Sequence, residues 1–192
     1  MTTRRDGTRE RIVSTAYSLF MWHGLSAVGV DRVVAEAGVA KSTLYRHFPS
    51  KDELVLAVLE RRDQTWTQGW LRNEVHRRAS TPGGRMLAIF DALDEWFNGQ
   101  EFEGSLLINS MLETHDHSSP VRGATVDGLS KVRAIAHELA EQTGARDPDD
   151  LAHKLQILIS GSIVAAEQGY FDSARRAREV AALILDREGI SS

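Results

Sequence analysis

The chain has 192 residues, 42% of them hydrophobic, and contains no cysteine. This length and composition allow one sizeable core with a small satellite domain, and they exclude disulfides, thiolate metal sites and a cysteine nucleophile. The formal net charge is −4, yet residues 1–50 hold seven cations against four carboxylates, a net +3, whereas the other 16 cations and 23 carboxylates give −7. A basic amino-terminal segment on an acidic body suits contact with phosphates at one end of the protein.

No apolar run approaches the roughly 20 residues that a membrane span needs. The start, MTTRRDGTRERI, also lacks the apolar core of about 7–15 residues that marks a signal peptide. We therefore expect a cytoplasmic protein with no membrane partner, and the absence of cysteine agrees with a reducing compartment.

Apolar residues recur with helical period along the whole chain, and no segment shows strand alternation. The pattern predicts an all-α fold of nine helices joined by short connections. The expected helices cover about residues 8–23, 30–37, 40–48, 51–78, 82–98, 102–115, 120–143, 148–169 and 173–188. Ser50 and Glu53 have the spacing of a capping box, and the pairs Thr81-Pro82 and Asp147-Pro148 each place a cap before a proline at the first helical position.

The two short helices near the amino terminus have the form of a helix-turn-helix. Gly38 lies between them, where a tight turn favours a glycine. An apolar seam is supplied by Val33, Val34, Ala37, Val39 and Leu44. The second helix presents Lys41, Ser42, Thr43, Tyr45, Arg46 and His47, which are side chains that reach phosphate oxygens and base edges in a major groove. The alternative is a helical hairpin that only packs, but a core element has no use for so many polar tips.

The stretch GLSAVGVDRVVAEAGVAKSTLYRHFPSKDEL resembles the DNA-binding signature of the TetR family of transcriptional regulators. The resemblance covers about residues 9–58, and its core, AGVAKSTLYRHFPSKDEL, is highly specific. It implies a nine-helix TetR-like architecture, with an N-terminal three-helix helix-turn-helix DNA-binding domain in residues 1–50. Residues 51–192 would then form the C-terminal helical ligand-binding and dimerisation domain.

The resemblance also implies roles for individual residues. Tyr45 and Lys51 would bind phosphates, while Ser42, Thr43 and Arg46 would enter the groove. Lys41 could serve either role, and His47 completes the motif. Where many members have Thr or Ser, this chain has Val28-Gly29, a change that removes a side-chain cap at little cost, and Arg32 would replace the lost contact. The basic residues Arg4, Arg5 and Arg9 form either a flexible arm for DNA or a solvated extension.

One recognition helix reads too few base pairs, so binding to two half-sites roughly 34–36 Å apart requires a homodimer. The last two helices are expected to form the interface as a four-helix bundle. Their stripes consist of Leu151, Leu155, Leu158 and Ser162, with the small residues Ser160, Gly161, Ala165 and Ala166, and of Ala174, Ala177, Ala181 and Ile184. Alternatively, both stripes face the core of the same subunit.

Aromatic and apolar residues with a few polar ones in the middle helices are typical of a small-molecule site. The candidate ligand-binding residues are Trp66, Trp70, Phe90, Trp96, Leu107, Ser110, Met111 and Glu113, and plain packing is the alternative for each. No cofactor and no metal are expected, because His115 and His117 would point apart on a helix.

We therefore expect a transcriptional regulator, and specifically a repressor, that binds double-stranded operator DNA as a homodimer and is released or modulated by a small-molecule effector. An enzyme is not expected, since no phosphate-binding glycine loop and no nucleophile motif occurs. Two other classes stay open. A helical interaction module would show no salt-dependent DNA binding, and a small enzyme on the same bundle would lose turnover on substitution of Glu113 or His115.

Overall fold

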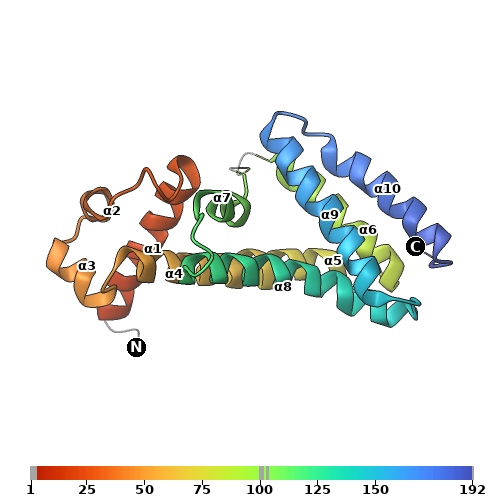
Figure 1. The fold of residues 1–192 in the computed structure, drawn as a ribbon, viewed down its shortest axis with the longest axis horizontal. Helices are drawn as coiled ribbons and strands as arrows, with labels where there is room; N and C mark the ends of the chain where they lie inside the picture. Colours follow the sequence, from red (N-terminus) through yellow and green to blue (C-terminus); the bar gives the residue numbers. More distant parts are fainter. Residues whose placement is uncertain (1–3, 100–101, 103, 192) are drawn as a thin grey trace. The chain divides into compact units, whose positions relative to one another are not determined.

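The computed structural model describes residues 4–99, 102 and 104–191, and every regular element in this part is a helix (Figure 1). The elements are α1 (Arg4–His23), α2 (Val30–Ala37), α3 (Lys41–His47), α4 (Lys51–Arg62), η1 (Asp63–Leu71), α5 (Arg72–Arg78), α6 (Pro82–Asn98), α7 (Leu106–Glu113), α8 (Pro120–Thr143), α9 (Pro148–Glu167) and α10 (Ser173–Arg187). The all-α prediction is confirmed. Among these helices none is both long and apolar enough to cross a bilayer.

Residues 51–78 form one continuous helical run, as predicted, but the run is not regular. It leaves α-helical hydrogen bonding at Asp63, continues as the π-helical segment η1, and returns to α-helix at Arg72. With this run counted as one helix, the described elements number nine. The apolar pattern did not reveal the π segment, because π-helical turns are rare and no proline, glycine pair or cap in the sequence marks where this one begins.

The ends of the helices follow local signals in most places. The side chains of Ser50, Thr81 and Asp147 accept hydrogen bonds from backbone N–H groups three residues later, at 3.0–3.1 Å. Two boundaries differ from the prediction. α1 begins at Arg4, so Arg9 lies in a helix and not in a flexible arm, and α7 is shorter than the expected 102–115.

The described chain divides into two compact units. Unit 1 comprises the described residues up to Asp63 together with Ser105–Gly128, and unit 2 comprises those of Gln64–Gly104 and of the part from Leu129 onward. This division differs from the expected domains, 1–50 and 51–192, because α4, which packs on α1, and the segment Ser105–Gly128 both belong to unit 1.

In unit 1, α1 is the central element and packs against α2, α3 and α4 (Figure 1). Its inner face is apolar and buried, with Ile12 and Ala16 at 0% exposure. Leu44 of α3 and Leu54 of α4 are also fully buried. These helices share one apolar core, and its burial holds the two short helices in place.

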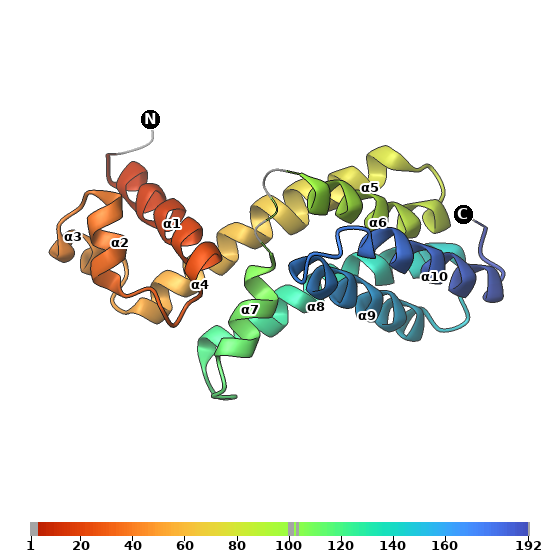
Figure 2. The ribbon, with the colours of Figure 1, turned by 90° about the horizontal axis from the view of Figure 1, so that it is seen from above.

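In unit 2, α6 is the central element and packs against α5, α9 and α10 (Figure 2). Apolar residues are buried along its length, including Met86, Ile89, Phe90 and Leu93 at 0% exposure. A helix that is apolar on most sides belongs in a core.

The last two helices present a different face from the one that the sequence suggested. Most of the expected interface stripe is buried inside the subunit, namely Leu151, Leu155, Ser162, Ala166, Ala174, Ala177 and Ala181. For these residues the alternative, packing in the subunit's own core, is correct. The exposed apolar side chains on α9 and α10 are instead Ile157, Val164, Val180 and Leu183.

Candidate nucleic-acid interface

The helices α2 and α3 form a helix-turn-helix in unit 1. Gly38 ends α2 with φ of +61°, in the left-handed region that favours glycine, and its N–H donates to the carbonyl of Ala35 at 3.3 Å. Val33, Ala37 and Leu44 are buried and hold the two helices together. Gly29 caps α2 with an extended backbone and no side-chain hydrogen bond, so the loss of a Ser or Thr there does not prevent the helix from starting.

The face of α3 away from the core is polar. Lys41, Ser42, Tyr45 and Arg46 are exposed, and Thr43 and His47 are half-buried. Tyr45 keeps 42% of its surface accessible, while Phe48, at the end of the helix, is 2% exposed. These two aromatic residues therefore differ: Phe48 belongs to the core, and the exposed Tyr45 is available to a ligand.

Two of the expected DNA-binding cations have partners within unit 1. Lys41 forms an ion pair with Asp31 at 2.7 Å, and the hydrogen bond and charge of Asp31 raise the pKa of Lys41. Arg32 lies 2.7 Å from Nε2 of His23. Both cations are exposed, so exchange of these partners for phosphate oxygens costs little.

The sequence did not reveal the roles of two further cations in this region. Lys51 is half-buried, and its ammonium group donates to the backbone carbonyl of Leu25 in the turn before α2. Arg9 of α1 places its guanidinium 5.2 Å from the ring centroid of Phe48. Such contacts join residues distant in sequence, and no local pattern signals them.

The expected ligand-binding residues lie in different parts of the structure. Trp66, Trp70 and Trp96 meet in unit 2 with ring centroids 5.0–6.5 Å apart. The cluster continues through Phe97 and Phe102. Phe90 is fully buried in α6, a position typical of core packing.

The other four expected ligand-binding residues belong to α7 in unit 1. Leu107 and Ser110 are buried and Met111 is half-buried. Glu113 does not face an apolar cavity, because its carboxylate accepts hydrogen bonds from the backbone N–H groups of Leu25 and Ser26. The structure thus gives Glu113 a partner at the amino-terminal helices.

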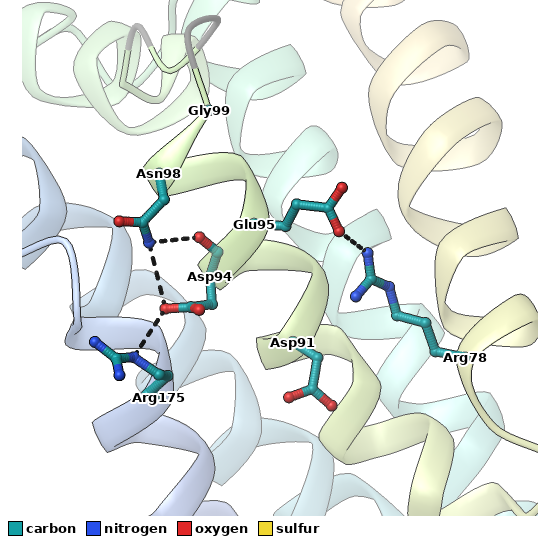
Figure 3. Close-up of a pocket in the computed structure, with 7 residues that line it drawn as sticks. All are labelled: Arg78, Asp91, Asp94, Glu95, Asn98, Gly99 and Arg175. Carbon is teal, nitrogen blue, oxygen red and sulfur yellow. Dashed lines mark hydrogen bonds and ion pairs between the residues drawn. The ribbon is translucent and has the colours of Figure 1, made fainter.

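Unit 2 also has an open pocket of about 750 Å³ on the polar side of α6 (Figure 3). It is lined by Arg78, Asp91, Asp94, Glu95, Asn98, Gly99 and Arg175. Each of its three carboxylates is paired with a cation: Glu95 with Arg78, Asp94 with Arg175, and Asp91 with Arg178. None of the expected ligand-binding residues lines it, and in the described part of the chain no group of His, Cys, Asp or Glu side chains is arranged to hold a metal ion.

The comparisons with known proteins agree with this geometry. Residues 12–58 match the family described as bacterial regulatory proteins, tetR family. Over 57 residues the chain is 46% identical to the HTH-type transcriptional activator FasR of Mycolicibacterium smegmatis. The aligned segment is 30% of this chain but only 26% of FasR. It is 25% identical to the HTH-type transcriptional regulator LmrA of Bacillus subtilis over 145 residues, covering 73% of this chain and 74% of LmrA.

The similarity in structure extends beyond the amino-terminal helices. The crystal structure of a TetR-family transcriptional regulator from Streptomyces coelicolor superposes with a TM-score of 0.83 and 27% identity, covering 94% of this chain and 89% of that one. Sequence motif, helix-turn-helix geometry and fold therefore agree: residues 12–58 match the tetR family, and the chain has the fold of TetR-family DNA-binding transcriptional regulators, to which it is similar in sequence and structure.

Proposed function

We propose that this protein is a cytoplasmic repressor that binds operator DNA as a homodimer and releases it when a small-molecule effector binds. The observation that carries the proposal is the exposed polar face of α3, where Ser42, Tyr45 and Arg46 are accessible above a buried Leu44. A helix held from below with hydrogen-bonding tips outward has the form that enters a major groove.

This arrangement supports the DNA-binding roles that the resemblance implies for individual residues. Arg46 and Ser42 are four residues apart and share one face of α3, so both can reach base edges. We propose that Tyr45 binds a phosphate and that Lys41 binds either a phosphate or a base edge. Arg32, Thr43, His47 and Lys51 complete the proposed contact set.

The homodimer is supported by the apolar surface of α9 and α10. Ile157 and Val164 lie on one face of α9, with Gly161 between them, and Leu183 is the most exposed apolar side chain of α10 at 70%. Burial of these side chains in a second copy would be favourable, and Gly161 would allow close approach of two helices. We propose that this surface, and not the buried stripe, forms the four-helix interface.

The effector site is supported by the tryptophan cluster of unit 2. Trp66, Trp70 and Trp96 are each only half-buried although they are large and apolar. Their faces suit a flat or aromatic molecule, since offset and edge-to-face contacts stabilise such pairs. We propose that the effector contacts this cluster.

The DNA-binding proposal is tested by selection from random double-stranded DNA with the purified protein. Enrichment of a two-fold symmetric site with half-site centres roughly 34–36 Å apart is expected, and affinity for that site should fall steeply with salt. The DNA-binding proposal would be contradicted if no sequence were enriched, or if binding did not depend on salt. A reporter gene behind the selected site distinguishes repression from activation.

The effector proposal is tested with tryptophan fluorescence. Trp22 is the fourth tryptophan and is 67% exposed in unit 1, so the Trp22→Phe variant leaves only the cluster as the source of signal. A library of small aromatic compounds should include one that quenches this fluorescence and lowers DNA affinity. A compound that releases DNA without changing the fluorescence would place the effector site elsewhere.

A further inference from the structure

The carboxylate of Glu113, the last residue of α7, binds the turn between α1 and α2. Its Oε1 accepts from the N–H of Leu25 at 3.1 Å, and its Oε2 accepts from the N–H of Ser26 at 2.7 Å. Hydrogen bonds from two peptide groups to one carboxylate are among the stronger ones in proteins. They join residues that are 87 and 88 positions apart in the sequence.

The turn is shaped to receive this carboxylate. Gly24 has φ of +79°, and a Cβ at this residue would lie 2.5 Å from Oε1 of Glu113. On the other side of the turn, the ammonium group of Lys51 donates to the carbonyl of Leu25. The peptide groups of Leu25 are thus held from α7 on one side and from α4 on the other.

The end of α7 that carries Glu113 is itself held by α8. Nη1 of Arg122 donates to the backbone carbonyls of Met111 at 3.0 Å and of Thr114 at 2.7 Å. These two carbonyls lie on both sides of Glu113 in the sequence. A change in the position of α7 or of the start of α8 would therefore change the position of the Glu113 carboxylate.

α7 also carries a buried polar side chain that none of the described residues satisfies. Ser110 is 0% exposed, and among the described residues its hydroxyl has no hydrogen-bond partner. It lies three residues before Glu113, one helical turn away on a neighbouring part of the same face.

We propose that Glu113 is a positioning residue for DNA binding: it couples α7 to the helix-turn-helix by fixing the turn that leads into α2. This inference rests on the proposed function. With the carboxylate in place, α2 and α3 are presented in one arrangement. When α7 moves, the N–H groups of Leu25 and Ser26 lose their acceptor, the turn loosens, and the arrangement that binds DNA becomes less populated.

The test compares Glu113→Gln with the matched control Asp127→Asn, which removes the same charge from an exposed position of unit 1. An amide can accept from only one of the two N–H groups and turns its own NH₂ toward the other. We expect hydrogen exchange of the Leu25 and Ser26 amides to become about tenfold faster in Glu113→Gln, and affinity for the selected DNA site to fall about tenfold. The control should change neither.

A second variant tests the coupling itself. Arg122→Met leaves the carboxylate and the residues of the turn unchanged, but it removes the donors that hold the end of α7. Faster exchange of Leu25 and Ser26 in this variant would show that α7 transmits its position to the turn. Unchanged exchange there would overturn the coupling.

The outcomes separate this inference from the proposed function. Wild-type protein that selects no DNA contradicts the proposed function, and the role of Glu113 in DNA binding falls with it. Wild-type protein that binds its site, together with a folded Glu113→Gln variant that binds equally well, contradicts only the role of Glu113. Thermal melting gives the folded fraction of each variant. DNA affinities are then compared at temperatures where the variants are equally folded, which excludes a loss of affinity through global unfolding.

Discussion

The ammonium group of Lys51 donates a hydrogen bond to the backbone carbonyl of Leu25 and so connects the start of α4 to the turn that precedes α2. Lys51 was expected from the sequence to bind a phosphate, and its half-buried position gives it a contact inside the protein as well. The two roles predict different effects on the salt dependence of DNA binding.

Replacement of Lys51 by Met should weaken binding to all DNA sequences alike. If the ammonium group also binds a phosphate, the slope of log affinity against log salt concentration should become shallower by about one. Fluorescence anisotropy at several salt concentrations measures both quantities. Lys131→Met, which removes the same charge from an exposed position of unit 2, is the control. Weaker binding with an unchanged slope would mean that Lys51 acts only by holding the turn.

Replacement of Arg46 by Ala should relax sequence preference, in contrast to Lys51→Met. An arginine bidentate to a guanine contributes about 1–3 kcal/mol of discrimination at one base pair. Binding to a set of sites that each carry one base change would show which position loses its preference. A uniform loss across all sites would place Arg46 on the phosphate backbone.

Replacement of Leu183 by Glu should separate the homodimer into monomers, because it places a charge at the centre of the exposed apolar surface of α10. Analytical ultracentrifugation measures the change in mass, and DNA affinity should fall with it. Val126→Glu is the matched control, since Val126 is also an exposed apolar residue, at 45%, but belongs to unit 1. A variant that remains dimeric would contradict the proposed interface.

The pairing of Glu138 with Arg72 should make unit 2 less stable in acid. Arg72 donates to the two carboxylate oxygens of Glu138 at 2.6 and 3.0 Å, and this pairing lowers the pKa of Glu138 below its ordinary value of 4.5. A lowered native pKa means that the stabilisation is present above the ordinary pKa and is lost as the pH falls through the native pKa.

The difference in melting temperature between wild type and Glu138→Gln should therefore be largest near neutral pH and shrink as the pH falls below the ordinary glutamate pKa of 4.5. Glu179→Gln, at an exposed position of α10, should show no comparable trend. A difference that stays constant with pH would mean that the carboxylate charge contributes nothing to stability.

The sequence by itself determined the helices and the DNA-binding motif, because both depend on local signals. Gly38 at a turn, Ser50 as a cap and a polar α3 act within a few residues of one another. Such patterns can be read from neighbouring residues without knowledge of the fold.

Only the tertiary structure decided which apolar stripe of α9 and α10 stays exposed and where Glu113 lies. Helical period shows that a stripe exists but not which element covers it, so the buried Leu155 and the exposed Leu183 look alike in the sequence. The carboxylate of Glu113 meets Leu25 because the chain returns to its amino-terminal helices after 88 residues. No pattern of neighbouring residues encodes that return, since it depends on how whole helices pack.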